Sequence, residues 1–327
     1  MLRKMVRSVS LMAIAVAGLA GASIAQAADI TLRAADVQAN TAYEKGLKSL
    51  AAKVAEATNG RVEIQVTMGT ALGSEADIVK QVRQGTLDIA QVGLSGYDKF
   101  QLFYIPFLFE KDKMMEFTRS DIAAQWKADV LKDWNVHLLE YVYFGPRHIT
   151  ANKPIVTPDD LKGVKIRVPQ FPTMVDAFQK WGANVIAMPV GELYISLQTG
   201  TIDAQENPLN FIVGTSLFEV QKALSLTAHV QAPRFLFIGD QAMQRLSAED
   251  QAALRKAASE VAADTEKELL ASEDVYLQTL KDKGMSVTEV DPAPFIPLVA
   301  DVGKEATEKL WGPGVLEKIR QDFGPRK

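Results

Sequence analysis

The phrase RQGTLDIAQ at residues 83–91 is almost repeated as QTGTIDAQE at residues 198–206. In each copy a glycine and a threonine precede an apolar residue and an aspartate, which is Asp88 or Asp203. For the nine residues alone, an ordinary turn from a helix into a strand is an alternative explanation. The phrase constrains the fold more strongly if its surroundings repeat as well.

The sequence before each copy predicts the same order of elements. Alternating apolar residues predict strands, and helical spacing with terminal glycines predicts helices. The first series is a strand, helix, strand, helix and strand at 29–34, 42–58, 61–68, 74–85 and 87–92. The second series has the same order at 164–168, 173–181, 184–188, 191–199 and 201–204. The repeated phrase therefore falls at the turn from the second helix into the third strand of two similar units.

Two such units predict two α/β lobes with sheets of parallel type. Ligands of these sheets bind beyond the carboxyl ends of the strands. If the lobes face each other, Gln91 and the pair Glu206-Asn207 lie on opposite sides of one cleft. Each copy of the phrase is then expected to bring amide or carboxylate groups to the cleft.

The sequence also predicts how the lobes are joined. Long β-rich runs at 134–150 and 220–238 can cross between them. The stretch from Ser247 to Lys283 has no glycine or proline and opens with a capping-box pattern, so we expect one helix of about 55 Å. The expected fold is a two-lobed α/β fold like that of periplasmic binding proteins, with hinge strands and a long helix spanning both lobes. We expect lobe I to contain residues 28–144 and 233–272, and lobe II residues 145–232 and 273–327.

Residues 1–27 are typical of a cleavable signal peptide. Basic residues precede an apolar run from Val9 to Ala25, and small residues at Ala25 and Ala27 predict cleavage after Ala27. The chain has no cysteine, which excludes disulfides and a lipid anchor. Acidic residues outnumber basic ones by 40 to 36, which argues against nucleic acid as a partner. We expect an exported protein of the periplasm.

Signatures of common enzyme classes are missing. The sequence has no Gly-x-Ser-x-Gly, phosphate loop, Gly-x-Gly-x-x-Gly or His-Glu-x-x-His motif. Its three histidines are far apart, so neither a metal nor a cofactor is expected. Binding is therefore favoured over catalysis. The alternative is a secreted α/β enzyme that acts on a sugar or organic acid through paired carboxylates such as Glu75 and Glu206.

Two arginines are candidates for binding an anionic ligand. Arg147 follows a Gly-Pro pair that interrupts a strand, and Arg167 lies near the carboxyl end of the strand at 164–168. A guanidinium can hold a carboxylate through two parallel hydrogen bonds. Arg167 also fits the solvated face of its strand, because it alternates with apolar residues. Asn207 precedes a proline, and its amide fits either a ligand contact or a plain turn.

The sequence GPRHITANKPI…DDLKGVKIRVP at 145–168, followed by MPVGELYISLQTGTIDAQENP at 188–208, resembles the substrate-binding proteins of TRAP transporters, DctP type. The resemblance covers nearly the whole chain after residue 27, including LGSE at 72–75. It implies two α/β lobes that close on a small organic acid and deliver it to a permease of a small and a large membrane subunit. It also implies that Arg167 pairs with the ligand carboxylate, that Arg147 is a second cleft arginine and that Asn207 contacts the ligand.

One position departs from the family pattern. Val190 stands where many relatives have an aromatic residue that can form a flat wall of the binding site. We expect Phe171 to form that wall instead. RHITANKPI resembles relatives that bind sugar acids, so a uronate is favoured over a C4-dicarboxylate or a 2-oxo acid. The protein is expected to be a monomer. The expected ligand-binding residues are Arg167, Arg147, Asn207, Gln91, Glu75, Gln170 and Phe171.

Overall fold

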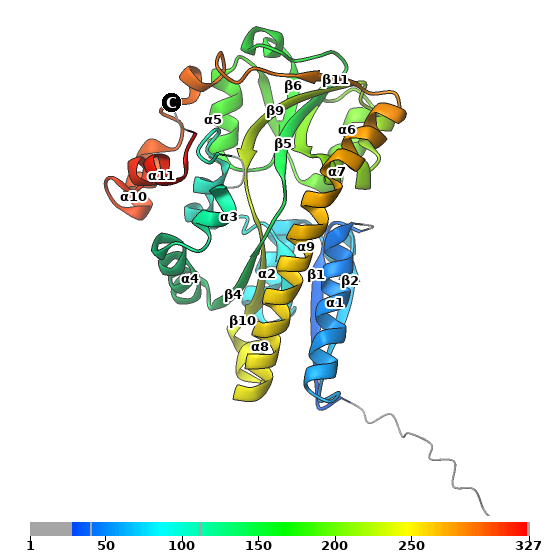
Figure 1. Cartoon of the computed structure of the whole chain (residues 1–327), viewed down its shortest axis with the longest axis vertical. Helices are drawn as coiled ribbons and strands as arrows, with labels where there is room; N and C mark the ends of the chain where they lie inside the picture. The colour runs from blue at the N-terminus through cyan, green and yellow to red at the C-terminus, as the bar shows by residue number, and fades with distance from the viewer. Residues whose placement is uncertain (1–27, 40, 111–112, 326–327) are drawn as a thin grey trace, which may run out of the picture.

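The computed structural model describes residues 28–39, 41–110 and 113–325, which form two β-sheets flanked by helices (Figure 1). The predicted signal peptide lies outside the described residues. In the order in which they pair, the strands of the first sheet are β2 (Val62–Met68), β1 (Ile30–Asp36), β3 (Ile89–Val92), β10 (Arg234–Gly239) and β4 (Val136–Val142). Those of the second are β11 (Ser286–Glu289), β9 (Ala223–Gln231), β5 (Pro146–Ala151), β8 (Ala204–Pro208), β6 (Lys165–Val168) and β7 (Asn184–Ala187).

The same three-strand unit occurs in both sheets. In the first, β1 lies between β2 and β3 and is parallel to both. In the second, β6 lies between β7 and β8, again parallel to both. The helix before each third strand is followed by a glycine, Gly85 or Gly200, with a φ of +71° that favours glycine. The connecting helices are α1 (Ala42–Ala57) and α2 (Glu75–Gln84) in the first unit, and α5 (Pro172–Lys180) and α6 (Leu193–Gln198) in the second.

The aspartate of the repeated phrase has the same structural task in both units. The Asp88 backbone N–H donates to the Arg33 carbonyl at 3.1 Å, and its Oδ2 accepts from the Arg33 N–H at 2.7 Å. The Asp203 N–H donates to the Lys165 carbonyl at 2.7 Å, and its Oδ2 accepts from the Lys165 N–H at 3.1 Å. Each aspartate therefore ties the start of the third strand to the first strand. The second of these strands, β8, begins at Ala204 rather than at the expected residue 201, because pairing with β6 starts there.

The chain crosses between the sheets along strands and along one long helix. β4 leads into β5, and β9 leads into β10, so each connection leaves one sheet and enters the other. The predicted long helix is confirmed as α9 (Ala248–Asp282). The Ser247 hydroxyl accepts from the Asp250 N–H at 3.1 Å and caps its first turn. In Figure 1, α9 runs beside α1 at the first sheet and reaches α7 (Leu209–Gly214) at the second.

The last two helices, α10 (Lys304–Trp311) and α11 (Val315–Phe323), lie against the earlier half of the chain. Trp311 donates its Nε1–H, at 3.3 Å, to the carbonyl of Lys99 in η2 (Asp98–Tyr104). The predicted lobe limits, which place residues 273–327 in lobe II, stay a prediction. None of the described helices is long and apolar enough to cross a membrane. The remaining α-helices are α3 (Lys113–Phe117), α4 (Asp121–Trp134) and α8 (Asp240–Gln244).

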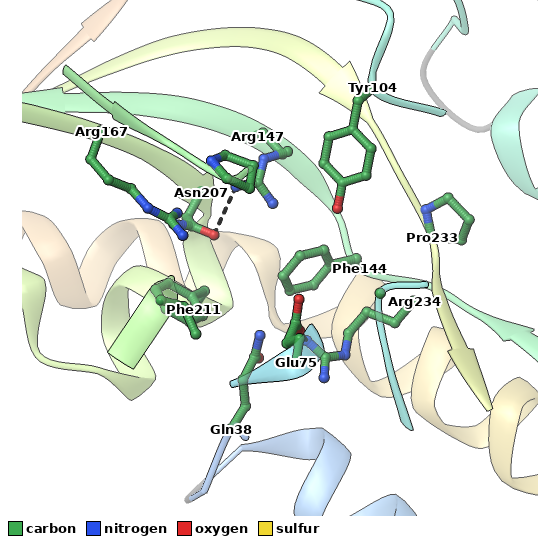
Figure 2. Close-up of a pocket in the computed structure, with 13 residues that line it drawn as sticks. Gln38, Glu75, Tyr104, Phe144, Arg147, Arg167, Asn207, Phe211, Pro233 and Arg234 are labelled. Atoms are coloured by element: carbon green, nitrogen blue, oxygen red, sulfur yellow. Dashed lines mark hydrogen bonds and ion pairs between the residues drawn. The ribbon is translucent and has the colours of Figure 1, made fainter. Parts of the chain in front are cut away.

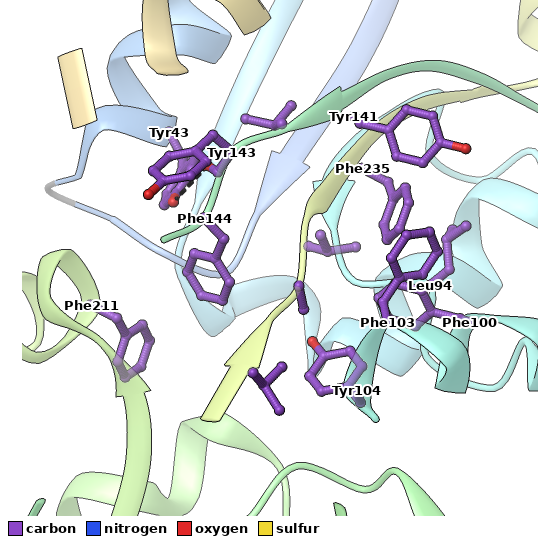
Figure 3. Packing of buried hydrophobic residues seen from close by; sticks show 14 of the residues in the cluster. Tyr43, Leu94, Phe100, Phe103, Tyr104, Tyr141, Tyr143, Phe144, Phe211 and Phe235 are labelled. Carbon is purple, nitrogen blue, oxygen red and sulfur yellow. Dashed lines mark hydrogen bonds between the residues drawn. The ribbon is translucent and has the colours of Figure 1, made fainter. Parts of the chain in front are cut away.

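An aromatic cluster fixes η2 to the first sheet (Figure 3). Phe100 packs edge-on against Phe235 of β10 at 4.7 Å between ring centroids, and Phe103 packs against Trp126 of α4 at 5.5 Å. These side chains are fully buried, and each such burial stabilises the fold by about 1.5–3 kcal/mol. Tyr104, at the end of η2, is thereby held at the border between the two sheets.

Candidate ligand-binding site

A pocket with a cavity volume of about 30 Å³ lies between the two sheets (Figure 2). Four of the seven expected binding residues line it: Glu75, Arg147, Arg167 and Asn207. Val190, which departs from the family pattern, lines it too. The other lining residues, which the sequence did not single out as ligand contacts, are Gln38, Gly93, Tyr104, Phe144, Pro169, Phe211, Pro233 and Arg234.

The structure does not bring the remaining three expected residues to the pocket wall. Gln91 is buried in β3, where its carbonyl oxygen accepts a hydrogen bond from Arg234 Nη2 at 2.5 Å. Gln170 is exposed outside the pocket. Phe171 stacks on Tyr104 at 4.1 Å between ring centroids. Phe171 thus supports the lining tyrosine from behind.

Arg147 is held by a carboxylate of the neighbouring strand. It lies on β5, whose partner β8 places Glu206 and Asn207 beside it. Arg147 Nε donates to Glu206 Oε2 at 2.5 Å, and Nη2 donates to Glu206 Oε1 at 2.8 Å. Nη2 also donates to the Asn207 Oδ1 at 3.0 Å. The charge of Arg147 is therefore compensated within the protein.

Glu206 is fully buried and has a second basic neighbour. His229 Nε2 lies 3.2 Å from Glu206 Oε2, and His229 Nδ1 lies 2.7 Å from the Thr227 hydroxyl. Burial raises the pKa of Glu206, but Arg147 and His229 outweigh it and hold the pKa below its ordinary value. Burial lowers the pKa of His229. Glu206 is thus an ionised partner of Arg147 and does not line the pocket as an acid or base.

Arg167 has no such partner. Its Nε and Nη2 both donate to the Met188 carbonyl, at 3.0 and 2.7 Å. Within residues 28–39, 41–110 and 113–325, no carboxylate forms an ion pair with it. The residue is 3% exposed, so the solvated-face interpretation is wrong. Burial lowers the pKa of Arg167 to about 10, which Glu206 only partly offsets, so the guanidinium is charged at neutral pH.

Arg234 is a third pocket arginine that sequence reasoning missed. Its Nη2 donates to Asp36 Oδ1 at 2.6 Å, and its Nη1 lies 3.4 Å from Glu75 Oε1. Its guanidinium also lies over the rings of Tyr43 and Phe144, at 4.9 and 5.4 Å from their centroids. A signal was available in the sequence. Pro-Arg pairs occur at 146–147 and 233–234, in both cases where a crossing strand begins, and a third pair occurs at 325–326 near the end of the sequence.

Asp36, at the end of β1, holds Arg234 from behind the pocket wall. Its Oδ1 also accepts from the Gln38 backbone N–H at 2.9 Å. Burial raises the pKa of Asp36, and the charge of Arg234 opposes this shift. Among the described residues, no group of three or more His, Cys, Asp or Glu side chains could hold a metal ion.

The sequence profile of the bacterial extracellular solute-binding proteins of family 7, DctP, matches residues 34–309. The chain belongs to the DctP family. This DctP-family protein is thus a TRAP-type solute-binding protein and not an enzyme. The alternative of paired catalytic carboxylates fails for a structural reason as well, because Glu206 is bound to Arg147 and His229, so Glu75 is the one carboxylate among the described residues that line the pocket.

Individual relatives of the DctP-family protein agree in sequence and structure. The solute-binding protein RD1_1052 of Roseobacter denitrificans is 34% identical over 246 residues, which are 73% of this chain and 74% of that protein. The crystal structure of that protein with bound L-galactonate matches this structure with a TM-score of 0.81 at 28% identity. The match covers 90% of this chain and 99% of the chain in the crystal structure. The 2,3-diketo-L-gulonate-binding periplasmic protein YiaO of Escherichia coli is 33% identical over 246 residues, 73% of this chain and 75% of that protein. A TRAP solute-binding protein from Chromohalobacter salexigens with bound D-glucuronate has a TM-score of 0.85 at 28% identity, covering 89% of this chain and 99% of that chain.

Proposed function

We propose that this DctP-family protein captures a sugar acid in the periplasm and delivers it to the small and large membrane subunits of a TRAP permease. The observation that carries the proposal is Arg167, a buried guanidinium that lines the pocket without a carboxylate partner among the described residues. A buried charge is strongly stabilised by a partner that also forms hydrogen bonds with it. A ligand carboxylate supplies that partner.

The neighbours of Arg167 orient the acid. Asn207 lines the same side of the pocket, and its Oδ1 is held by Arg147 while its Nδ2 donates to the Gln205 side chain at 2.6 Å. Apolar walls come from Tyr104 of η2, Phe144 of the β4–β5 connection and Phe211 of α7. Figure 2 shows these rings around the space between the arginines. Such a wall suits the carbon skeleton of a sugar acid.

The size of the cavity supports binding by movement of the lobes. At about 30 Å³ it is far smaller than the roughly 300–1,000 Å³ of typical small-molecule pockets. A six-carbon acid therefore enters when the lobes are apart, and contacts from both sheets favour the closed form. The crossing strands and α9 are the elements that bend.

The ligands of the relatives support a sugar acid as the bound acid. One has bound L-galactonate, another has bound D-glucuronate, and YiaO is named for 2,3-diketo-L-gulonate. A C4-dicarboxylate is the second candidate, because the C4-dicarboxylate-binding DctP of Vibrio cholerae is 32% identical over 62% of this chain. A uronate or an aldonate is the first candidate, because D-glucuronate and L-galactonate are bound in these relatives.

The test begins with the purified protein. Mass spectrometry of small molecules released on denaturation, followed by calorimetry with D-glucuronate, L-galactonate, succinate and pyruvate, should show one acid bound per chain and returned unchanged. Binding to the folded state should also raise the melting temperature. Absence of stabilisation by all four acids, or product in excess of one equivalent, would contradict the proposal.

A further inference from the structure

We infer that the end of the pocket opposite Arg167 recognises hydroxyl groups and rejects a second carboxylate, and that Glu75 and Gln38 determine this specificity. The ligand is then a polyhydroxylated acid with a single carboxylate. The inference rests on the proposed function, because it takes Arg167 as the partner of that carboxylate.

The charges of the pocket arginines leave room for one carboxylate. Arg147 is paired with Glu206, and Arg234 is paired with Asp36 at 2.6 Å and approached by Glu75 at 3.4 Å. Arg167 is the pocket arginine for which the described residues provide a carbonyl oxygen but no carboxylate. One ligand carboxylate therefore pairs with Arg167. A second ligand carboxylate would find no pocket arginine that lacks a carboxylate partner.

The opposite end is built by the first sheet and its helices. Gln38 follows β1, Glu75 is the first residue of α2 and Arg234 begins β10. Figure 2 shows these three side chains together, across the pocket from Arg167 and Asn207. The two ends of a ligand held by Arg167 thus meet different sets of groups.

Two buried atoms on pocket-lining residues at this end have no hydrogen-bond partner among the described residues. They are the acceptor Gln38 Oε1 and the donor Arg234 Nε, on residues that are 5% and 2% exposed. Leaving such atoms unpaired is unfavourable. A hydroxyl group both donates and accepts, so hydroxyls can satisfy both atoms. An ionised carboxylate only accepts, so it can pair with Arg234 Nε but leaves Gln38 Oε1 unpaired.

Glu75 adds repulsion to this mismatch. Its carboxylate lines the pocket and can accept a hydrogen bond from a ligand hydroxyl. A ligand carboxylate at the same place would face a like charge, and Arg234 is already bound to Asp36 on the other side. Like charges brought together in a closed interface oppose binding strongly. The same side chain therefore favours a hydroxylated end and disfavours an acidic one.

The inference is tested with acids matched in length. Calorimetry would compare L-galactonate with galactarate, D-gluconate with D-glucarate, and both monocarboxylates with hexanoate, which has no hydroxyl groups. We expect at least one sugar monocarboxylate to bind at least about tenfold more tightly than its dicarboxylate and than hexanoate. Equal binding of the mono- and dicarboxylate would overturn the inference and leave the receptor function standing. No binding by any of the five acids, and none by D-glucuronate, would overturn both.

Single substitutions test which side chains cause the preference for a hydroxylated monocarboxylate. Glu75→Gln removes the charge from a partly exposed position at the start of α2, and should reduce the preference for monocarboxylate over dicarboxylate by at least about threefold. Gln38→Leu should reduce the preference for the sugar acid over hexanoate. Glu63→Gln, an exposed carboxylate on β2, is the matched control and should change neither ratio. If Glu63→Gln reduced the preference for the monocarboxylate as much as Glu75→Gln does, the role inferred for Glu75 would be wrong.

Discussion

At the scale of single residues, the three arginines of the pocket differ in what holds them. Arg147 and Arg234 each bind a buried carboxylate, whereas both donors used by Arg167 end on one backbone carbonyl, that of Met188. That carbonyl fixes the plane of the guanidinium without neutralising its charge. Arg167 is therefore oriented in advance for a ligand anion.

The first prediction concerns Arg167→Lys. The variant keeps a positive charge but loses the planar fork, so the affinity for the acid should fall by at least about tenfold. Burial already lowers the pKa of Arg167 to about 10, and lysine, whose ordinary pKa is only about 10.4, would be lowered further toward neutral. Because a lysine is charged only below its pKa, the variant should bind progressively more weakly as the pH rises from 6.5 to 9. Calorimetry across this range measures both effects.

Arg255→Lys provides the control for this prediction, because Arg255 is exposed on α9. It should leave affinity and its pH dependence as in the parent protein. The parent should lose less affinity than the lysine variant across the range, since the Arg167 guanidinium stays charged and the raised pKa of Asp36 affects both proteins alike. A lysine variant that binds as tightly as the parent at every pH would show that Arg167 does not contact the ligand.

At the scale of elements, the turns at Asp88 and Asp203 have the same local structure but differ in their exposure to solvent. Asp88 and Asp203 make the same pair of backbone contacts to the first strand of their units. The Asp88 side chain is 7% exposed and also binds Arg245, while the Asp203 side chain is 42% exposed. Water can replace the lost contact at Asp203 more readily than at Asp88.

We therefore expect Asp88→Ala to be the more destabilising of the two substitutions. It removes a buried acceptor from the Arg33 N–H and from Arg245, which should cost about 1–3 kcal/mol, whereas Asp203→Ala should cost about 0.5–1 kcal/mol. Urea unfolding measures both free energies. Asp88→Asn, which retains an acceptor oxygen, should recover part of the loss. Equal losses at the two sites would show that burial of the turn does not set its contribution.

At the scale of the whole molecule, a polar contact joins the two sheets beside the pocket. Asn210 of α7 donates through Nδ2 to the Phe144 carbonyl at 2.8 Å and to the Tyr43 hydroxyl of α1 at 3.3 Å. Tyr43 in turn donates to the Tyr143 carbonyl at 3.2 Å. Phe144 lines the pocket, but Asn210 does not. The contact therefore joins α7 to α1 and to the β4–β5 connection without lining the pocket.

The corresponding prediction is that Asn210→Ala speeds ligand release. Loss of these hydrogen bonds should disfavour the closed form by about 0.5–1.5 kcal/mol. Since closure follows encounter with the ligand, the rate constant of dissociation should rise by about threefold to tenfold with little change in association. Stopped-flow fluorescence with the identified acid measures both rates. The exposed Asn152→Ala should leave them unchanged, and a slower association in Asn210→Ala would instead indicate a role in the open form.

Much of the fold was predictable because its determinants are local. Apolar alternation, terminal glycines and the capping serine of α9 each act within a few residues, so the order of elements and the long helix follow from the sequence. The start of β8 was placed too early, because the strand begins where β6 offers a pairing partner and not where the apolar pattern begins. The motifs at 145–168 and 188–208 were sufficient to indicate the DctP family, and the match of the family profile to residues 34–309 confirms it.

The sequence by itself therefore determined two similar α/β units, their long connecting helix and the arginine residues available for an acid. Only the tertiary structure decided which arginine is unpaired and that Arg234 belongs to the pocket. Ion pairs such as Arg147–Glu206 and Arg234–Asp36 join residues far apart in the chain, and no local pattern records them. The charge that a ligand meets is what remains after these pairs have formed, so it is a property of the folded molecule.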